Sequence, residues 1–244
     1  MLKGKRIIIT GASRGIGRAI AVACAREGAV IGVNSNLSAS TAKALCDEIG
    51  SAAIPLPFDV SSAGAIRAAF DFFVQETGGI DVLVNNAGIN LPALLVSATD
   101  KEVEAMLKTN LAGPILCTRA ALPVMLQQHS GVVLNVSSVA AVRPVRGQAV
   151  YAASKGGIEA LTRAVAAEYA RKGIRCLCIR PGAIDTAMLS MARNVALPEI
   201  LSRIPQNRLA APEEVAELAV FLISDRCGYI TGSVHTIDGG SAAG

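Results

Sequence analysis

Residues Lys5–Gly17 read KRIIITGASRGIG, and this stretch decides the fold. The apolar, β-branched run at its start predicts a buried strand, and the pattern after it predicts a helix over Gly15–Glu27. Glycines at positions 11, 15 and 17 let the backbone between the two elements turn tightly and approach a ligand closely. A helix that begins there points unpaired N–H groups, and the positive end of its dipole, at an anion such as a pyrophosphate. The alternative is a tight turn that holds no ligand.

The turn supplies a first set of candidate cofactor-binding residues. Its spacing is G-x-x-x-G-x-G rather than G-x-G-x-x-G, but the same physical argument applies. Arg14 favours a phosphate ligand, because a guanidinium inside the loop can reach one. The candidates are Gly11, Ser13, Arg14, Gly15, Ile16 and Gly17.

Beyond this turn, short apolar runs alternate with longer helical patterns along the chain. The alternation predicts right-handed crossovers and an α/β fold whose parallel sheet carries helices on both faces. No linker, repeat or low-complexity tract divides residues 1–244, so a single domain is expected. The predicted strands are Lys5–Thr10, Ala29–Asn34, Ala52–Phe58, Ile80–Val84, Val132–Ser137, Ile174–Arg180 and Ser233–Ile237. The further predicted helices are near Ser38–Ile49, near Ser62–Thr77, Lys101–Gln128 with a break near Ala112–Pro114, Ala149–Arg171, Met188–Arg203 and Pro212–Leu222.

The composition excludes several other classes of protein. The 244 residues are 52% hydrophobic and carry a net charge of +4, a balance that excludes intrinsic disorder. No stretch approaches the roughly 18 to 20 uninterrupted apolar residues that a membrane span needs. Nucleic-acid binding is not expected, because the chain has no basic stripe with stacking aromatics. The apolar excess instead predicts a deep core and surface buried between subunits, and therefore an oligomer.

The placement of cysteine and histidine argues against a metal site. None of the six cysteines forms a C-x-x-C pair, and His129 and His235 have no neighbouring ligands at metal spacing. We interpret the cysteines as small buried residues of a protein in a reducing compartment. The N-terminus begins a strand almost at once and shows no secretory apolar region, so a cytoplasmic protein is expected.

The second predicted strand ends in Val33-Asn34-Ser35-Asn36, without an acidic residue. In dinucleotide-binding folds, an acidic side chain near this point holds the ribose 2′-hydroxyl of NAD. A carboxylate would repel a 2′-phosphate, whereas Arg14 and the polar groups of Asn34, Ser35 and Asn36 would favour one. The sequence therefore favours NADP(H) over NAD(H), unless these polar residues only begin a turn.

Two further predicted strands end in residues suited to a ligand site. Asp59 and Val60 follow the third strand, and Asn86, Ala87 and Gly88 follow the fourth. Open α/β sheets bind ligands at the carboxyl ends of their strands, so all five are candidates for the cofactor site. The Asp59 carboxylate could accept a hydrogen bond from an adenine amine, or it could cap the helix that follows.

The catalytic candidates follow the fifth predicted strand. Ser138 lies at its end, and Tyr151-Ala152-Ala153-Ser154-Lys155 comes thirteen residues later. Tyr151 and Lys155 are i and i+4 on a predicted helix, so they share a face. A nearby ammonium lowers the pKa of a phenol, which would let Tyr151 exchange a proton with a substrate oxygen near neutral pH. Ser138 could hold the same oxygen through a hydrogen bond.

With these motifs on one chain and in this order, the sequence resembles the short-chain dehydrogenase/reductase family. The resemblance implies a seven-stranded, doubly wound, Rossmann-like sheet and a Ser138–Tyr151–Lys155 site assisted by Asn110. It implies that Lys155 also binds the nicotinamide ribose, and that Asn110 holds a water in a proton relay by bending its helix. It further implies nicotinamide contacts from the segment containing Pro181, Gly182, Ile184 and Thr186, and an oligomer, most often a homotetramer.

Within the family, the chain is similar to members that reduce 3-oxoacyl thioesters on acyl carrier protein. The shared features include N-N-A-G-I, Leu94-Leu95 and Tyr229-Ile230-Thr231-Gly232. Pro92 replaces a common Asp, and Gln127-Gln128-His129-Ser130 stands where basic residues would dock an acidic carrier. The expected function is NADPH-dependent reduction of a 3-oxoacyl thioester, on acyl carrier protein or coenzyme A. The alternatives are a sugar, polyol or small-alcohol dehydrogenase and a non-catalytic NADP(H)-binding sensor.

Three segments are expected to select the substrate: Ile89–Val96, Ala140–Gln148 and a lid over about 188–204. Met188, Leu189, Met191 and Leu197 could line a flexible apolar cover over an acyl chain. The alternative is that these side chains only pack their helix against the rest of the molecule.

Overall fold

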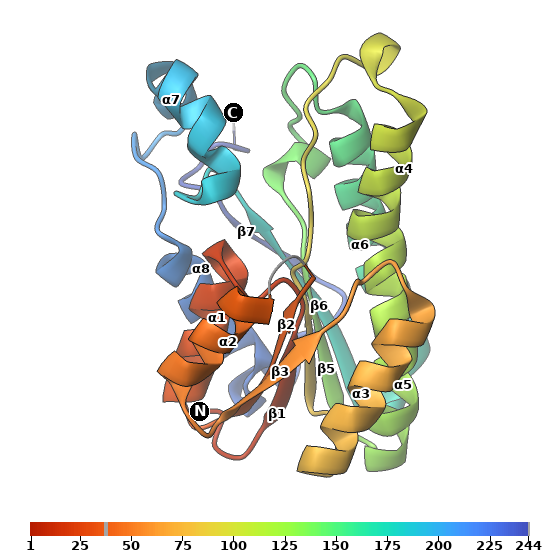
Figure 1. Ribbon diagram of the computed structural model, residues 1–244. Helices are drawn as coiled ribbons and strands as arrows, with labels where there is room; N and C mark the ends of the chain where they lie inside the picture. The colour runs from red at the N-terminus through yellow and green to blue at the C-terminus, as the bar shows by residue number, and fades with distance from the viewer. Residues whose placement is uncertain (37–38, 244) are drawn as a thin grey trace.

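The computed structural model describes residues 1–36 and 39–243, and at positions 39 and 191–195 the backbone only. Seven parallel strands of these residues form one sheet in the order β3-β2-β1-β4-β5-β6-β7 (Figure 1). This is the doubly wound, seven-stranded α/β sheet that the sequence predicts. The strands are β1 (Arg6–Ile9), β2 (Val30–Ser35), β3 (Ala53–Pro57), β4 (Val82–Asn85), β5 (Gly131–Val136), β6 (Ile174–Pro181) and β7 (Val234–Ile237).

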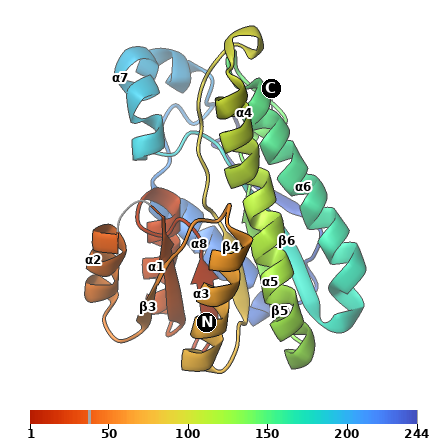
Figure 2. The same cartoon turned by 45° about the vertical axis from the view of Figure 1, so that its right-hand side comes forward.

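Helices cover both faces of the sheet, with α1, α2 and α8 on one face and α3, α5 and α6 on the other (Figures 1 and 2). The α-helices are α1 (Gly15–Arg26), α2 (Ala39–Ile49), α3 (Ala63–Thr77), α4 (Asp100–Leu107), α5 (Gly113–Gln128), α6 (Ala149–Tyr169), α7 (Ala187–Ser202) and α8 (Pro212–Ile223). Short 3₁₀ turns are η1 (Leu95–Ser97), η3 (Val139–Ala141), η4 (Ala170–Lys172) and η5 (Asp225–Cys227), and η2 (Lys108–Ala112) is a π-turn.

The core consists of two apolar layers, one on each face of the sheet. Successive side chains of β1 point to opposite faces, as in any strand. Ile7 and Ile9 therefore pack into the layer that contains Ile20 of α1, whereas Ile8 packs into the layer that contains Phe73 of α3. Strands buried on both faces explain why the sequence carries continuous Val and Ile runs rather than an alternating pattern.

The topology places a ligand crevice between β1 and β4. β1 pairs with β2 on one side and with β4 on the other, so the chain runs outward from this point in both directions. The connections that follow β1 and β4 lead to helices on opposite faces, and the space between them is where open α/β sheets bind ligands. The candidate residues after β1, β2, β3, β4, β5 and β6 all lie at this carboxyl end of the sheet.

Two predicted helices differ in detail from the observed ones. The predicted Met188–Arg203 segment forms α7, which is interrupted at Ala196 (φ −139°, ψ 32°). Pro198 accounts for the interruption, because proline removes a backbone N–H and its ring clashes with the preceding turn. The predicted start of the second helix at Ser38 lies outside the described residues, and α2 is described from Ala39.

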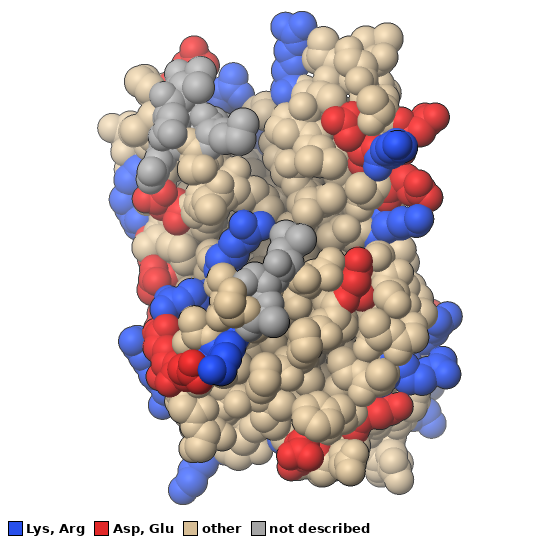
Figure 3. Space-filling model, in the orientation of Figure 1, with Lys and Arg blue, Asp and Glu red and all other residues tan. Residues whose placement is uncertain are grey.

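The cysteines are small and mostly buried residues, as the sequence predicts. All six cysteines are free thiols, and all but the half-buried Cys46 are buried. Within the described part of the chain, no cluster of three His, Cys, Asp or Glu residues is placed to hold a metal ion. Figure 3 shows acidic and basic side chains interspersed over one face, without a continuous basic band. None of the described helices is both long enough and apolar enough to span a bilayer.

Candidate active site

The glycine-rich turn between β1 and α1 needs glycine at Gly11 and Gly15, which have positive φ, and at Gly17, which has no room for a Cβ. Gly11 has φ +62°, in the left-handed region where side chains are strained. Gly17 has an ordinary φ, but a Cβ there would lie 2.3 Å from Asn86 Nδ2 and 2.4 Å from the Gly11 carbonyl oxygen. Both distances are far inside van der Waals contact. The turn therefore accepts backbone alone at these points, as a site for a closely approaching pyrophosphate requires.

Hydrogen bonds fasten this turn to the loop after β4. The amides of Asn86 and Ala87 both donate to Thr10 Oγ1, at 3.0 and 3.1 Å. In return, Asn86 Nδ2 donates to the carbonyl oxygens of Thr10 and Gly11, at 2.9 and 3.0 Å. These hydrogen bonds hold the turn after β1 and the loop after β4 in a fixed position relative to each other. Asn86 and Ala87 therefore lie directly beside the glycine turn.

The start of α1 fits the phosphate end of a dinucleotide. Arg14 is the extended residue before the helix, its side chain caps none of the helix N–H groups, and it is exposed. The first-turn amides, with the positive end of the helix dipole, can therefore receive an anion. On the other side, Thr186 Cγ2 comes within 3.4 Å of where a Cβ of Gly15 would stand. The predicted phosphate and nicotinamide segments therefore lie next to each other at the glycine turn.

Asn34 has a different role from the one predicted for its side chain. It is 1% exposed, and its Nδ2 group donates to the carbonyl oxygens of Leu56 and Phe58 at 3.0 and 2.9 Å. Its Oδ1 accepts from the Gly11 amide at 3.0 Å. Both amide hydrogens are in use, so the side chain has no donor left for a 2′-phosphate. Asn34 instead stabilises the glycine turn through its hydrogen bond with the Gly11 amide.

Of the other residues at the ends of β2 and β3, Asn36 and Asp59 interact with each other. Ser35 is buried, whereas Asn36 is exposed and its side chain hydrogen-bonds to the Asp59 carboxylate. The Ser61 amide also donates to Asp59 Oδ1, at 2.8 Å. The Ser61 hydrogen bonds, with the one from Asn36, lower the pKa of Asp59 below its ordinary value. The cap of α3 is Ser62, which accepts from the amide of its third residue at 3.4 Å, so Asp59 is not the N-cap.

Tyr151, Ser138 and Lys155 come together at the carboxyl end of β5. Tyr151 and Lys155 lie one turn apart on α6, with Lys155 Nζ 5.8 Å from the centre of the Tyr151 ring. The Tyr151 hydroxyl hydrogen-bonds to the Ser138 side chain. Ser138 Oγ also accepts from the Ala140 amide at 3.2 Å, which fixes its rotamer at the start of η3. The three side chains predicted from the sequence therefore form one group.

The protonation of this group differs from the sequence-based expectation. Tyr151 is 8% exposed, and burial raises the pKa of its phenol while the hydrogen bond to Ser138 lowers it by less. Lys155 is not among the groups that shift the pKa of Tyr151, and its Nζ donates to the Val136 carbonyl oxygen at 2.8 Å. Burial also lowers the pKa of Lys155 to about 8. Near neutral pH, the Tyr151 phenol is therefore protonated and uncharged.

Asn110 belongs to the site through its helix and its neighbours. The predicted break between α4 and α5 is the π-turn η2, which lies just before Gly113-Pro114 and includes Asn110. Asn110 Oδ1 accepts from the Ile89 amide, and Asn110 Nδ2 donates to the Ile89 carbonyl oxygen, both at 2.8 Å. Nδ2 also donates to Ser154 Oγ at 3.2 Å. The side chain thus joins the loop after β4 to α6 and has no amide hydrogen left for a water.

The segment after β6 is built around Gly182. Its amide donates to the Ile237 carbonyl oxygen at 2.9 Å, and a Cβ on it would lie 2.7 Å from the Cα of Asp238. Ile184 is buried and pairs with Ala210 in an isolated parallel bridge. These contacts fix the backbone that leads to Thr186, opposite the glycine turn.

Two of the predicted substrate segments run together as one wall, and α7 lies apart from them at the same end of the sheet (Figure 1). The Ala93 amide donates to the Gly147 carbonyl oxygen at 3.0 Å, so the loops after β4 and β5 run together. This wall carries large apolar side chains that are exposed in the chain on its own: Leu91, Leu94, Leu95, Val96, Val142 and Val145. Met188 of α7 is exposed as well. The side chain of Met191 lies outside the described residues.

A family model described as enoyl-(acyl carrier protein) reductase matches residues 11–242, nearly the whole chain. The chain belongs to the short-chain dehydrogenase/reductase family. It is 39% identical to the 3-oxoacyl-[acyl-carrier-protein] reductase FabG of Thermotoga maritima, with 98% of each chain covered. Proteins of the same name from Chlamydia trachomatis, at 38% identity with 99% of each chain covered, and Staphylococcus aureus, at 37% with 97% covered, are also similar. As a short-chain dehydrogenase/reductase, the protein is an oxidoreductase that uses a nicotinamide cofactor.

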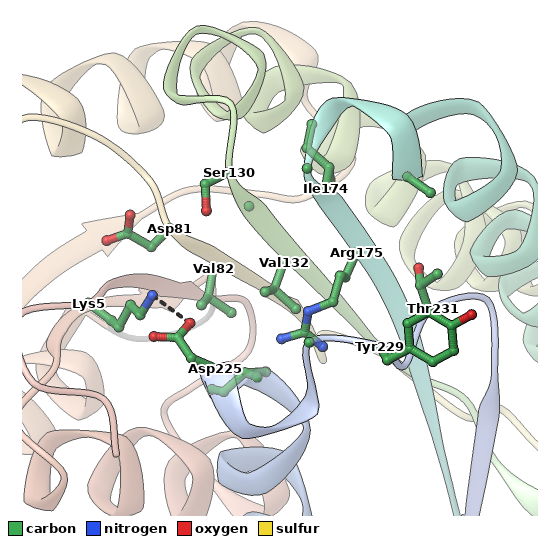
Figure 4. A pocket seen from close by; sticks show the side chains of 15 residues that line it. Lys5, Asp81, Val82, Ser130, Val132, Ile174, Arg175, Asp225, Tyr229 and Thr231 are labelled. Carbon is green, nitrogen blue, oxygen red and sulfur yellow. Dashed lines mark hydrogen bonds and ion pairs between the residues drawn. The ribbon is translucent and has the colours of Figure 1, made fainter.

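A separate cavity of about 590 Å³ lies at the opposite end of this short-chain dehydrogenase/reductase (Figure 4). It opens at the amino ends of β4, β5 and β6 and contains none of the candidate site residues. Its polar lining is internally paired: Lys5 contacts Asp225 at 3.0 Å, and Arg175 donates to the carbonyl oxygens of Leu222 and Ser224 at the end of α8.

Sequence reasoning missed one pair of residues at the carboxyl end, Glu159 and Arg180. Arg180 donates to the Glu159 carboxylate from Nε at 2.8 Å and from Nη2 at 2.6 Å. The only available signal was that Glu159 lies four residues after Lys155, on the same face of α6. An acidic residue at that spacing is usually solvated, so the signal was too weak to single it out.

Proposed function

We propose that this oxidoreductase uses NADPH to reduce the ketone of a 3-oxoacyl thioester to the 3-hydroxyacyl form. The observation that carries the proposal is the group of Tyr151, Ser138 and Lys155 at the carboxyl end of β5. Similarity over nearly the full length to proteins named 3-oxoacyl-[acyl-carrier-protein] reductase supports the substrate class. The apolar wall beside the crevice favours an acyl chain over a polyol, because a polyol would leave that surface without an apolar partner.

Tyr151 and Ser138 supply the two hydrogen bonds that a reacting carbonyl oxygen needs. Burial keeps the Tyr151 phenol protonated at neutral pH, so it can transfer its proton to the oxygen as negative charge develops there. Ser138 Oγ is held beside the Tyr151 hydroxyl and donates to the same oxygen. A nicotinamide cofactor supplies the hydride when bound. The protein contributes orientation, the proton and a site partly shielded from water.

Lys155 provides a positive charge behind Tyr151 in a buried position. It is 4% exposed, and its Nζ is anchored on the Val136 carbonyl oxygen. Two further N–H groups of the ammonium remain to hold the nicotinamide ribose, as family resemblance implies. The charge stabilises the Tyr151 phenolate that forms when the proton leaves.

The remaining candidate residues would hold the dinucleotide. Gly11, Gly15 and Gly17 would cradle the pyrophosphate at the start of α1, and the segment from Gly182 to Thr186 would contact the nicotinamide. Preference for NADP(H) rests on the exposed guanidinium of Arg14 and the absence of a carboxylate at residues 34–36. Asn34 no longer supports this preference directly, because its donors are used inside the protein.

The thioester carrier is either acyl carrier protein or coenzyme A. Gln128, in place of a basic docking residue, is turned inward: its Oε1 accepts from the Ile80 amide at 3.0 Å and its Nε2 donates to the Ile80 carbonyl oxygen at 2.8 Å. Arg171 and Lys172 are exposed and remain available to an acidic carrier.

The test follows NADPH oxidation with acetoacetyl-coenzyme A, an acetoacetyl carrier protein and a crotonyl thioester, and NADP+ reduction with a panel of sugars and polyols. Turnover of either acetoacetyl thioester well above that of the other compounds is expected. Crotonyl turnover alone would favour the enoyl reduction named in the family description, and polyol oxidation alone would favour the alcohol-dehydrogenase alternative. Either outcome would contradict the proposed substrate.

A further inference from the structure

The Glu159 carboxylate joins three segments that meet at the candidate active site. Glu159 lies on α6, one turn beyond Lys155, and is 5% exposed. It receives two hydrogen bonds from Arg180, at 2.8 and 2.6 Å, and one from Ser137 Oγ at 2.9 Å. Two parallel bonds from a guanidinium fix the carboxylate in position as well as in charge. The structure thus contains a defined cluster formed by Glu159, Arg180 and Ser137.

Each partner of Glu159 is adjacent in sequence to a group that the reaction needs. Ser137 immediately precedes Ser138, and its Oγ also donates to the Lys155 carbonyl oxygen at 3.2 Å. Arg180 immediately precedes the Pro181-Gly182 turn that leads to the nicotinamide segment. Through the cluster, the helix bearing the proton donor is connected to the ends of β5 and β6.

The cluster is ionised at neutral pH. Burial by itself would raise the pKa of Glu159, but hydrogen bonds from Arg180 and Ser137, together with the charge of Arg180, hold it below its ordinary value. The hydrogen bonds with Glu159 also raise the pKa of Arg180. This charged pair constrains the positions of Glu159 and Arg180 more than an apolar contact would, because a shift of either side chain leaves a buried charge unpaired.

We propose that Glu159 is a positioning residue of the reaction, which holds Ser138 and the segment after Arg180 in register with Tyr151 and Lys155. The inference rests on the proposed catalytic role of these residues. Its alternative is that Glu159 and Arg180 only stabilise the fold, as many buried ion pairs do. The two accounts differ in what happens to turnover when stability falls by the same amount.

The chain contains a matched control, the Arg6–Asp81 pair. Arg6 donates to the Asp81 carboxylate from Nε at 2.8 Å and from Nη2 at 2.7 Å, which is the same two-pronged geometry. This pair joins the amino ends of β1 and β4, at the end of the sheet away from the candidate site. Glu159→Gln and Asp81→Asn each remove one carboxylate charge and leave an arginine without its ionic partner. Arg180→Lys is a milder third variant, which keeps the positive charge but loses the two parallel hydrogen bonds of the guanidinium.

Steady-state kinetics and hydrogen exchange are measured on the full-length variants, with thermal midpoints measured alongside. Glu159→Gln is expected to lower kcat by about tenfold or more, since small misplacements at a reaction centre cost this much, with KM values for NADPH and ketone changed by less than about threefold. Arg180→Lys should give a smaller loss in the same direction. Asp81→Asn should lower the thermal midpoint similarly and keep the kcat of the wild type.

Hydrogen exchange of the protein alone separates this inference from the proposed substrate. Amides of residues 137–142 and 182–187 should exchange faster in Glu159→Gln than in Asp81→Asn, whatever ketone the enzyme reduces. Unchanged exchange in these segments, or equal loss of kcat in the two variants, would overturn the positioning role. If the wild type reduced no acetoacetyl thioester but the exchange difference were present, the substrate proposal alone would fail.

Discussion

At the scale of single residues, the site combines groups whose burial alters their ionisation. Lys155 and Tyr151 are both buried, and burial moves their pKa values toward the uncharged forms, downward for the ammonium and upward for the phenol. Such an arrangement is costly for folding and useful for proton transfer. Side chains of this kind are expected to be replaceable with a gain in stability and a loss of function.

Lys155→Met is predicted to stabilise the fold while abolishing turnover. The folded state binds the Lys155 proton less tightly than the unfolded chain does, since the pKa falls from 10.5 to about 8. The resulting loss of folding free energy is fully present below about pH 8 and disappears as the pH rises toward 10.5, the pKa of the lysine in the unfolded chain. Denaturant unfolding at pH 7 should show a gain of about 1–3 kcal/mol, which shrinks by pH 10. A variant less stable than the wild type at pH 7 would contradict this account of the buried charge.

Arg14→Ala is predicted to weaken binding of NADPH more than binding of NADH. The exposed guanidinium at the start of α1 is the cation proposed to meet the 2′-phosphate, and a charge-assisted hydrogen bond contributes roughly 1.5–3 kcal/mol. Fluorescence titration should show the Kd for NADPH rising by about tenfold or more, with the Kd for NADH changed by less than about twofold. Equal losses for the two cofactors, or a wild type that prefers NADH, would refute the assignment of Arg14.

At the scale of elements, the turn between β1 and α1 is the proposed site of the cofactor's pyrophosphate. Hydrogen bonds from Asn34 and Asn86 hold it from two sides, and Gly17 packs against both Asn86 and Gly11. The turn is therefore a fixed part of the crevice. Changes that move it should affect cofactor binding before they affect the rest of the sheet.

Gly17→Ala tests this rigidity, with Gly64→Ala as its matched control. A Cβ at Gly17 would meet Asn86 Nδ2 and the Gly11 carbonyl oxygen, whereas one at Gly64 in the first turn of α3 would meet nothing within 4 Å. Gly17→Ala should destabilise the protein by about 1–3 kcal/mol and raise the Kd for NADPH by about tenfold or more. Gly64→Ala should stabilise by up to about 1 kcal/mol and leave the Kd unchanged. NADPH binding of wild-type strength in Gly17→Ala would contradict the account.

The elements that the sequence predicts well are those determined by local pattern. Buried strands such as Arg6–Ile9 need continuous apolar residues, and the glycine turn needs its glycines, so both can be predicted from the sequence alone. The hydrogen-bond partners of the Asn34 and Glu159 side chains cannot be predicted in this way, because those partners are 20 or more positions away in the sequence. The ionisation of Tyr151 was also expected in the wrong direction, since its burial arises only when α6 packs against the sheet.

At the scale of the whole molecule, the apolar composition is divided between the core and the surface. The two layers around the sheet account for most of it, but several large apolar side chains remain exposed in the single chain. Leu107 of α4 and Ile115 of α5 lie on the outer side of the helical layer, and Tyr229 is fully exposed. Exposed apolar groups of this size commonly mark interfaces between proteins.

The protein is therefore predicted to form an oligomer, with a homotetramer expected from the family resemblance. Light scattering coupled to size-exclusion chromatography should give the mass of four chains of 25.0 kDa each at micromolar concentration. Ile115→Glu should lower that mass if α5 contributes to an interface, because a carboxylate buried there would lose its hydration. A wild type that elutes as a monomer at this concentration would contradict the prediction.

The central claim is that Tyr151 provides the proton for reduction of a ketone, and one comparison tests it most directly. NADPH oxidation is followed with acetoacetyl-coenzyme A for the wild type and for Tyr151→Phe, and the Kd of NADPH is measured for both. The account predicts that Tyr151→Phe lowers kcat by about 10²–10⁴-fold, as expected for loss of a general acid, with NADPH affinity within about threefold of the wild type. A Tyr151→Phe variant that keeps most of its kcat would contradict the account.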